Sequence, residues 1–292
     1  MNRTRKFLNA AAALLTGLSV LNSVSTEAAT LYGATSAGGP GDLYTLDPTT
    51  GAVVTHIGSL NDASSVNYPI TGLAFNPLTG VLYGSTGNAG SVDAMLVTIN
   101  PATALVTPIG FFNAGPVNSG GTPSTMADLA FDSAGNLYGI GSIGGPQLYS
   151  INLATAQATV IGNSGLTSTT GGGLAISSGG VFYGTPTATR FGTYNSGTGV
   201  YSNIANPAKP TGGGAYGALD FDGTTLYGLN VGSGSPPPTA LVTISPSGVV
   251  TSVGLSLDSL DAIAFAPVPE PGSLALLLLA GSLALVQRSR KA

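Results

Sequence analysis

The chain has 292 residues, including 44 glycines and 19 prolines, with no cysteine, no tryptophan and a single histidine. Only 7% of the residues are charged but 43% are apolar, so the chain has the apolar content for a core that disordered sequences lack. The absence of cysteine excludes disulfides, thiolate nucleophiles and thiolate metal sites.

The charges are distributed unevenly along the chain. Six of the eight lysines and arginines lie at the two ends, and residues 30–267 carry only Arg190 and Lys209 against ten aspartates. Two positive charges against ten negative ones give this central part a formal charge of −8. Nucleic-acid binding depends on clustered basic side chains, so a nucleic-acid partner is excluded.

Residues 1–29 have the three-part pattern of a secretory signal peptide. Residues 2–6 are basic, residues 7–20 are apolar, and residues 23–29 are mostly small. The apolar run is short for a membrane span of about 20 residues, and small residues suited to cleavage follow it. We therefore predict export through the inner membrane, with cleavage near Ala28 or Ala29.

Residues 30–267 contain an internal repeat. A Tyr-Gly pair after an apolar residue recurs at intervals of 51, 55, 45 and 44 residues. About ten residues before each of the last four pairs lies a short segment of the form small-Leu-Ala-Phe. The five Tyr-Gly pairs are Tyr32-Gly33, Tyr83-Gly84, Tyr138-Gly139, Tyr183-Gly184 and Tyr227-Gly228.

Two further short apolar segments follow each Tyr-Gly pair, and the second usually ends in an apolar residue plus glycine, as in Ile57-Gly58 and Ile109-Gly110. Turns rich in Asn, Asp and Gly separate the segments. Four strands per unit at this period predict an all-β fold, a β-propeller of five four-stranded blades.

The ends of the repeat region predict ring closure. The first unit lacks its small-Leu-Ala-Phe strand, and a copy of it appears after the last unit at Asp261–Phe265. If this strand completes the first blade, no open sheet edge is left at the joint. A flat or sandwiched β-domain is the alternative, because the segments 113–125 and 232–238 are long for turns.

Residues 268–292 form a distinct tail. It begins with Val268-Pro269-Glu270-Pro271, continues with the uncharged stretch 272–287, and ends with the basic residues Arg288, Arg290 and Lys291. As a helix, the 16 uncharged residues would span about 24 Å of a hydrocarbon core of about 30 Å. Basic residues hold such a terminus in the cytoplasm.

This tail resembles the PEP-CTERM sorting signal of Gram-negative bacteria, in which a Pro-Glu-Pro motif, an apolar helix and a basic cluster follow in this order. The resemblance implies that an exosortase-like enzyme at the membrane acts at the motif, in proteins often encoded beside exopolysaccharide genes. The protein would then be anchored transiently and reach the cell surface or the medium. The alternative is a permanent membrane anchor after a proline-rich linker.

Catalytic signatures are weak in this sequence. Residues 139–144 match a dinucleotide-binding pattern in letters, but a strand follows them where that motif requires a helix. His56 is the only imidazole and has no evident partner for a triad or a metal site. Lys209 has no phosphate loop around it, and no Gly-x-Ser-x-Gly sequence occurs.

Aspartates are the remaining candidates for chemistry. Asp132, Asp220 and Asp222 lie near predicted strand ends and turns, where they would either coordinate calcium or cap their own turns. Turn carboxylates of this kind are expected to be solvated and ionised. A glycosidase would need two acids converging on one substrate, and acids with raised pKa values in one cleft would favour it.

The tyrosines divide into two groups. Those of the Tyr-Gly pairs repeat with the blade and are expected to pack between blades. Tyr68 and Tyr201 lie in predicted loops and are candidates for stacking on sugars.

The sequence therefore favours a non-enzymatic surface or matrix protein that binds or scaffolds exopolysaccharide in a biofilm, without a cofactor unless calcium binds. An exported hydrolase or lyase that acts on polysaccharide through aspartates is the alternative. A third possibility is an inert structural or adhesive component, and fold class alone does not choose among the three.

Overall fold

The computed structural model of the chain describes residues 29–36, 39–87, 92–112, 125–141, 145–167 and 171–268. These residues form strands and turns, and residues 30–267 are one compact unit. The predicted signal peptide, the sorting helix and the basic tail lie outside the described residues. Within the described ranges, no helix is long and apolar enough to cross a membrane.

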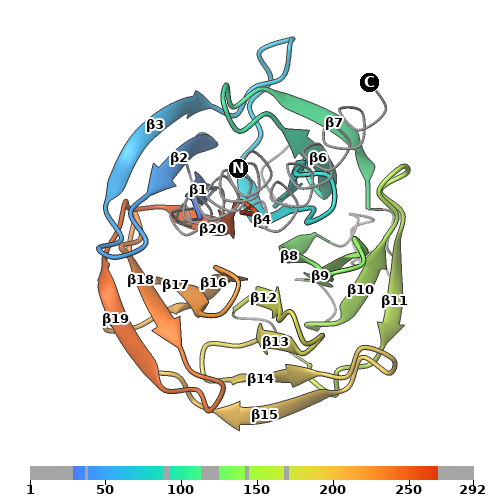
Figure 1. The fold of residues 1–292 in the computed structure, drawn as a ribbon, viewed down its shortest axis with the longest axis vertical. Coiled ribbons are helices and arrows are strands. Elements are labelled where there is room, and N and C mark those ends of the chain that lie inside the picture. Colours follow the sequence, from blue (N-terminus) through green and yellow to red (C-terminus); the bar gives the residue numbers. More distant parts are fainter. Residues whose placement is uncertain are drawn as a thin grey trace, which may run out of the picture. The chain divides into compact units, whose positions relative to one another are not determined.

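Five four-stranded antiparallel sheets surround a common axis (Figure 1), so the predicted five-bladed propeller is confirmed. We number the blades from the sheet that contains β1. The strands are β1 (Leu31–Thr35), β2 (Asp42–Leu46), β3 (Val53–Ser59), β4 (Ile70–Phe75), β5 (Leu82–Thr86), β6 (Met95–Ile99), β7 (Val106–Phe111), β8 (Met126–Phe131), β9 (Leu137–Gly141), β10 (Leu148–Ile151), β11 (Ala158–Gly162), β12 (Gly173–Ile176), β13 (Phe182–Thr185), β14 (Phe191–Tyr194), β15 (Tyr201–Ala205), β16 (Ala215–Phe221), β17 (Leu226–Val231), β18 (Thr239–Ile244), β19 (Val250–Leu255) and β20 (Leu260–Phe265).

The last strand completes the first blade, as predicted from the missing strand of the first repeat. β20 pairs antiparallel with β1, with Leu31 opposite Phe265 and Gly33 opposite Ile263. Just beyond the strand, the amide of Ala266 donates to the carbonyl oxygen of Thr30 at 2.9 Å. The order β20-β1-β2-β3 therefore closes the ring through main-chain hydrogen bonds.

Aromatic rings join neighbouring blades at the repeat positions. The tyrosine of a Tyr-Gly pair meets an aromatic ring of the next blade, as Tyr32 does with Phe75 and Tyr227 with Phe265, at ring-centroid distances of 5.4 and 4.9 Å. Such pairs add to the energy of burying the rings. The expected packing role of these tyrosines is confirmed.

The glycine of each pair leaves room for the third strand of its blade. A Cβ atom on Gly33 would lie 2.9 Å from the side chain of Leu46, and one on Gly184 would lie 2.6 Å from the ring of Tyr194. A larger residue in this position would displace a core side chain, which explains why Tyr-Gly recurs in every blade.

A β-bulge in the outermost strand receives a turn of the following blade. In β19, Leu241 pairs with Gly254 and Val242 with Ser252, so Val253 is the extra residue of the bulge. A Cβ atom on Gly254 would lie 2.0 Å from the carbonyl oxygen of Thr50 in blade 1. The same contact recurs at Gly162 in β11, where a Cβ atom would lie 2.0 Å from the carbonyl oxygen of Thr198.

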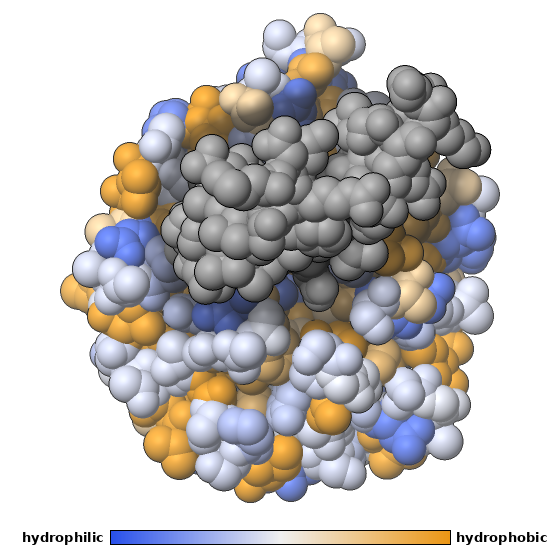
Figure 2. All heavy atoms as spheres, in the orientation of Figure 1, coloured by the Kyte–Doolittle hydropathy of each residue, from blue (hydrophilic) through white to orange (hydrophobic). Residues whose placement is uncertain are grey.

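These bulges also disrupt the free edge of each outer strand, which would otherwise offer a pairing template to other chains. All five outer strands carry one, because the register between the third and fourth strands shifts at this position in every blade, and blade 1 has a second shift between Thr45 and Leu46. The outer strands form the rim of the ring in Figure 1. Among the coloured residues in Figure 2, apolar side chains are scattered between weakly polar ones.

Candidate functional site

The innermost strands β4, β8, β12, β16 and β20 are terminal in their sheets, so each presents a free main-chain edge to the axis (Figure 1). Amide groups on such an edge need acceptors when they are buried. Aspartate side chains of two of these strands supply them.

Asp128 of β8 links three blades. Its Oδ1 accepts the amide of Leu129 at 2.9 Å, and its Oδ2 accepts the amides of Leu174 in β12 and Leu219 in β16 at 2.8 and 3.0 Å. The side chain is fully buried. Burial raises the pKa of Asp128 well above its ordinary value, and the three amide hydrogen bonds oppose this only in part.

Asp220 of β16 makes the equivalent link to blade 1. Its Oδ2 accepts the amide of Phe265 in β20 at 2.6 Å, and its Oδ1 accepts the amide of Phe221 at 2.8 Å. Burial raises the pKa of Asp220 to about 7. The expectation that this residue is a solvated turn carboxylate is wrong, because it lies inside a strand whose edge faces the axis.

A comparison of the five repeats would have drawn attention to Asp128 and Asp220. Asp220 occupies the position of the alanine in the small-Leu-Ala-Phe segment, and Asp128 occupies the position of its small residue. The signal in the sequence is an aspartate where the other repeats have Gly or Ala on the innermost strand. From that strand its carboxyl group can reach main-chain amides of neighbouring blades.

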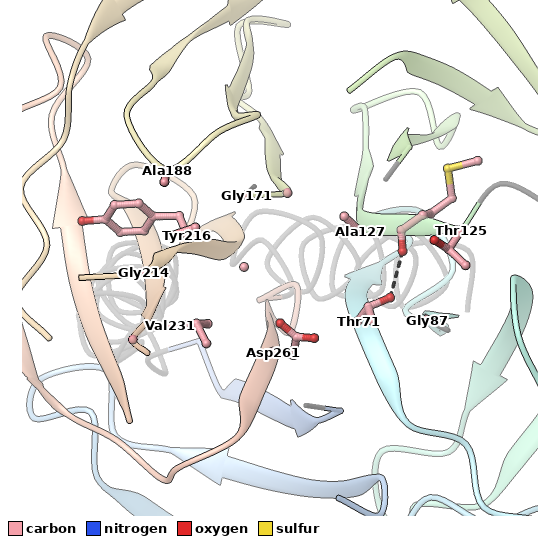
Figure 3. A pocket seen from close by; sticks show the side chains of 15 residues that line it. Thr71, Gly87, Thr125, Ala127, Gly171, Ala188, Gly214, Tyr216, Val231 and Asp261 are labelled. Atoms are coloured by element: carbon pink, nitrogen blue, oxygen red, sulfur yellow. Dashed lines mark hydrogen bonds between the residues drawn. The ribbon is translucent and has the colours of Figure 1, made fainter. Parts of the chain in front are cut away.

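A cavity of 610 Å³ lies at the end of the ring where the inner strands begin (Figure 3). Its walls consist mainly of glycine, alanine and strand backbone, with Thr71, Thr125 and Val231 among the larger side chains. We call it the axial pocket. Its described lining residues are Thr71, Gly87, Thr125, Met126, Ala127, Gly171, Gly172, Ala188, Gly214, Ala215, Tyr216, Gly217, Val231, Gly232 and Asp261.

Hydrogen bonds between inner strands hold the wall of the axial pocket in place. Thr71 Oγ1 donates to the carbonyl oxygen of Met126 at 2.8 Å, which joins β4 to β8 (Figure 3). The amide of Gly172 donates to the carbonyl oxygen of Tyr216 at 3.0 Å, which joins the segment before β12 to β16. The pocket is therefore a preformed feature of the ring.

Asp261 of β20 is the only charged residue among the described lining residues. Its half-buried carboxyl group accepts a hydrogen bond from the side chain of Ser36, while burial raises its pKa to about 6. Gly217 lies opposite, and a Cβ atom there would be 2.9 Å from Asp261 Oδ1. A glycine at this position thus keeps the carboxyl group accessible from the pocket.

Tyr216 lines the axial pocket, but its ring points away from it (Figure 3). The side chain is fully buried, and its hydroxyl donates to the carbonyl oxygen of Ala208 at 2.5 Å. Burial raises the pKa of this phenol, so it stays neutral and anchors the segment before β16.

A second cavity, of 480 Å³, lies between blades 4 and 5. It is lined by uncharged residues, among them the rings of Tyr183 and Phe221, whose centroids are 5.9 Å apart, and the threonines Thr224 and Thr251. We call it the interblade groove.

The turn aspartates predicted as calcium ligands cap their own turns. Asp132 Oδ1 accepts the amides of Ala134 and Asn136, and Asp222 Oδ1 accepts those of Thr224 and Thr225. Among the residues that the structure describes, no three acidic, histidine or cysteine side chains gather as a metal-binding group. The structure therefore does not bring Asp132, Asp220 and Asp222 together at one site.

His56 lies on the exposed strand β3. Its Nε2 is 3.3 Å from Asp42 Oδ1, and its ring stacks on Tyr44 with centroids 4.7 Å apart. Ser59 Oγ donates to the same Asp42 oxygen at 2.7 Å. His56 and Ser59 therefore both contact Asp42. A catalytic triad instead needs the histidine between the serine and the aspartate.

The two tyrosines considered for sugar stacking are buried. Tyr68 is 4% exposed and donates from its hydroxyl to Asp62, and Tyr201 is 9% exposed and packs on Tyr194. Neither ring offers a free face, so this expectation is wrong.

The fold and the tail together define a class, an exported five-bladed propeller with a preformed axial pocket. Residues 267–291 match the PEP-CTERM protein-sorting motif, which implies processing by an exosortase at the membrane. Residues 59–224, more than half of the chain, match DUF6923, described as a repeat of unknown function. The chain therefore belongs to the DUF6923 family.

Comparison with solved structures gives distant matches. A Bacteroides thetaiotaomicron protein of unknown function is 15% identical, with a TM-score of 0.44 over 78% of this chain and 65% of that one. TolB from Acinetobacter baumannii is 14% identical, with a TM-score of 0.42 over 80% and 54%. The chain thus spans less than two thirds of the length of both.

A third match is a catalytically inactive virginiamycin B lyase from Staphylococcus aureus, 9% identical, with a TM-score of 0.42 over 75% of this chain and 68% of that one. Similarity at this level carries no argument about function. No curated protein matches the chain in sequence.

Proposed function

We propose that the chain is a non-catalytic propeller of the cell surface or extracellular matrix, and that it binds a segment of exopolysaccharide in its axial pocket. The observation that carries this proposal is the described lining of the pocket, in which neutral, small residues and strand backbone surround the carboxyl group of Asp261. Ligand sites combine such shaped walls with a few fixed polar groups.

The size and rigidity of the axial pocket suit a saccharide. Its volume of 610 Å³ falls within the range of roughly 300–1,000 Å³ typical of small-molecule sites. Because hydrogen bonds between blades fix its wall, a bound segment would lose little free energy to ordering the protein. The sorting motif supports the link to exopolysaccharide, since it resembles signals often encoded beside such genes.

The alternative, a polysaccharide hydrolase or lyase, draws support from the raised pKa values of Asp128, Asp220 and Asp261. Glycoside hydrolysis, however, needs two carboxyl groups about 5–9.5 Å apart that both face the substrate. Asp128 and Asp220 hold main-chain amides with both oxygens and do not line the axial pocket. Their raised pKa values follow from burial in the ring.

The test is binding and turnover measured on the same glycan panel. The purified full-length chain in detergent should bind at least one matrix glycan in calorimetry and release no reducing ends from it. Val231→Phe, which fills the axial pocket, should weaken binding by at least about tenfold, or about 1.4 kcal/mol.

Val160→Phe is the matched control, because Val160 is 48% exposed on the outer strand β11 and does not line the pocket. Its affinity should equal that of the wild type. Binding that survives Val231→Phe would assign the ligand elsewhere, for example to the interblade groove. Release of reducing ends that is lost in Asp261→Asn would establish the enzyme instead.

A further inference from the structure

Among the residues that the structure describes, no cation pairs with the carboxyl group of Asp261. Burial raises the pKa of Asp261, and the hydrogen bond from Ser36 lowers it in part. The groups that face it are Ser36 after β1, Gly217 in β16 and the other uncharged residues of the pocket wall. At neutral pH the group is mostly ionised, and a half-buried unpaired charge is costly.

The surroundings of this carboxylate favour a positively charged ligand. The repeat domain has a formal charge of −8, so it repels anionic ligands. The inner strands are terminal in their sheets, and such an edge leaves carbonyl oxygens as well as amides without a partner strand. An ammonium group has three donors and no acceptor, so it can bind the carboxylate and such carbonyl oxygens together.

A metal ion fits the site less well than an ammonium group. Calcium takes six to eight oxygen ligands and usually several carboxylates. The described lining of the pocket offers one acidic side chain, and no metal-binding group of three occurs among the described residues.

We propose that the axial pocket selects a sugar unit with a free, protonated amine, and that this amine binds the carboxylate of Asp261 opposite Gly217. The ligand class is a hexosamine polymer that has lost some of its N-acetyl groups. This inference rests on the proposed function and specifies its ligand.

The experiment compares three oligosaccharides of equal length by calorimetry on the full-length chain at pH 6.5 and low salt, where the sugar amine carries a proton and more than half of the Asp261 carboxyl groups are ionised. They are a glucosamine oligomer, its fully N-acetylated form and a glucose oligomer. We expect the glucosamine oligomer to bind at least about tenfold more tightly than the other two. Adding salt should narrow this difference, because screening weakens charge interactions.

Two variants test the role of the carboxylate. Asp261→Asn keeps the shape of the side chain and should abolish the preference, so that the glucosamine oligomer binds no more tightly than the acetylated one. Gly217→Ala, whose Cβ atom would lie 2.9 Å from Asp261 Oδ1, should weaken amine binding without removing the charge. If Asp261→Asn fails to fold, Gly217→Ala still tests whether the amine binds at the carboxyl group of Asp261.

The outcomes separate the two proposals. If none of a broad set of glycans binds, the proposed function fails. If the acetylated or the glucose oligomer binds as tightly as the glucosamine oligomer, or if Asp261→Asn changes nothing, the proposed function stands and the amine inference is overturned. Binding that requires calcium and is lost in EDTA would also overturn it.

Discussion

The bulge glycines provide a direct test of ring closure. In Gly254→Ala the new Cβ atom would lie 2.0 Å from the carbonyl oxygen of Thr50, although real Cβ contacts are rarely shorter than 3.0 Å. The obstructing atom belongs to the main chain, so no side-chain rotation relieves the overlap. Blades 5 and 1 must separate by about 1 Å at their outer strands.

Overpacking of this kind costs about 1–3 kcal/mol. For a domain of this size, 1 kcal/mol lowers the melting temperature by about 2–4 °C, so a decrease of about 2–12 °C is expected. The assay is thermal unfolding of the full-length chain followed by circular dichroism. The matched control is Gly179→Ala, because a Cβ atom there meets nothing closer than 3.8 Å.

A second variant makes the test specific to closure. Gly162→Ala creates the same 2.0 Å overlap, with the carbonyl oxygen of Thr198, between blades 3 and 4. A closed ring predicts similar losses for both variants. If Gly162→Ala is destabilised while Gly254→Ala melts like the wild type, blades 5 and 1 are not in contact and the closed ring is refuted.

Truncation after Gly254 removes β20 and exposes the core of blade 1, so we expect aggregation or a large loss of stability; an unchanged melting temperature would contradict closure. Replacing Pro269, Glu270 and Pro271 with alanine should trap the protein in the inner membrane, as fractionation would show; normal release would refute the sorting assignment. Burial raises the pKa of Asp220 to about 7, so between about pH 4 and pH 7 the folded state binds more protons than the unfolded state. The free energy of unfolding should therefore decrease as the pH rises across this window, by at most about 4 kcal/mol for this group. Urea titrations at pH 5 and pH 8 should show this decrease in the wild type and a smaller one in Asp220→Asn.

The fold could be predicted because its determinants repeat. The Tyr-Gly pair answers a local steric requirement that every blade has, and the apolar-Gly pair of the outer strand recurs in four of the five blades, with Ile204-Ala205 in its place in blade 4. The extra copy at Asp261–Phe265 revealed the closure, since a strand left over at one end matched a strand missing at the other.

The repeat pattern marks Asp128 and Asp220 as exceptions among the inner strands, but it does not show what their carboxyl groups contact. The contacts of Asp128 with Leu174 and Leu219 join residues 46 and 91 positions apart, and only the ring geometry brings their amides to one carboxylate. Asp261 likewise becomes a pocket residue because β16 places a glycine opposite it. The roles of Asp128 and Asp261 depend on which groups the folded ring buries beside them, and a single sequence does not show this directly.

The pairing of β20 with β1 also sets the order of events during export. If the predicted signal peptide directs secretion from the N-terminus, β1 to β3 arrive first, yet their blade stays incomplete until Phe265 has crossed the membrane. Blades 2 to 5 have all four strands before that moment. Val268, where the sorting motif begins, follows three residues after Phe265. Closure of the ring and delivery of the motif to the processing enzyme are therefore nearly simultaneous, and a chain that reaches the enzyme has all its blades available to fold.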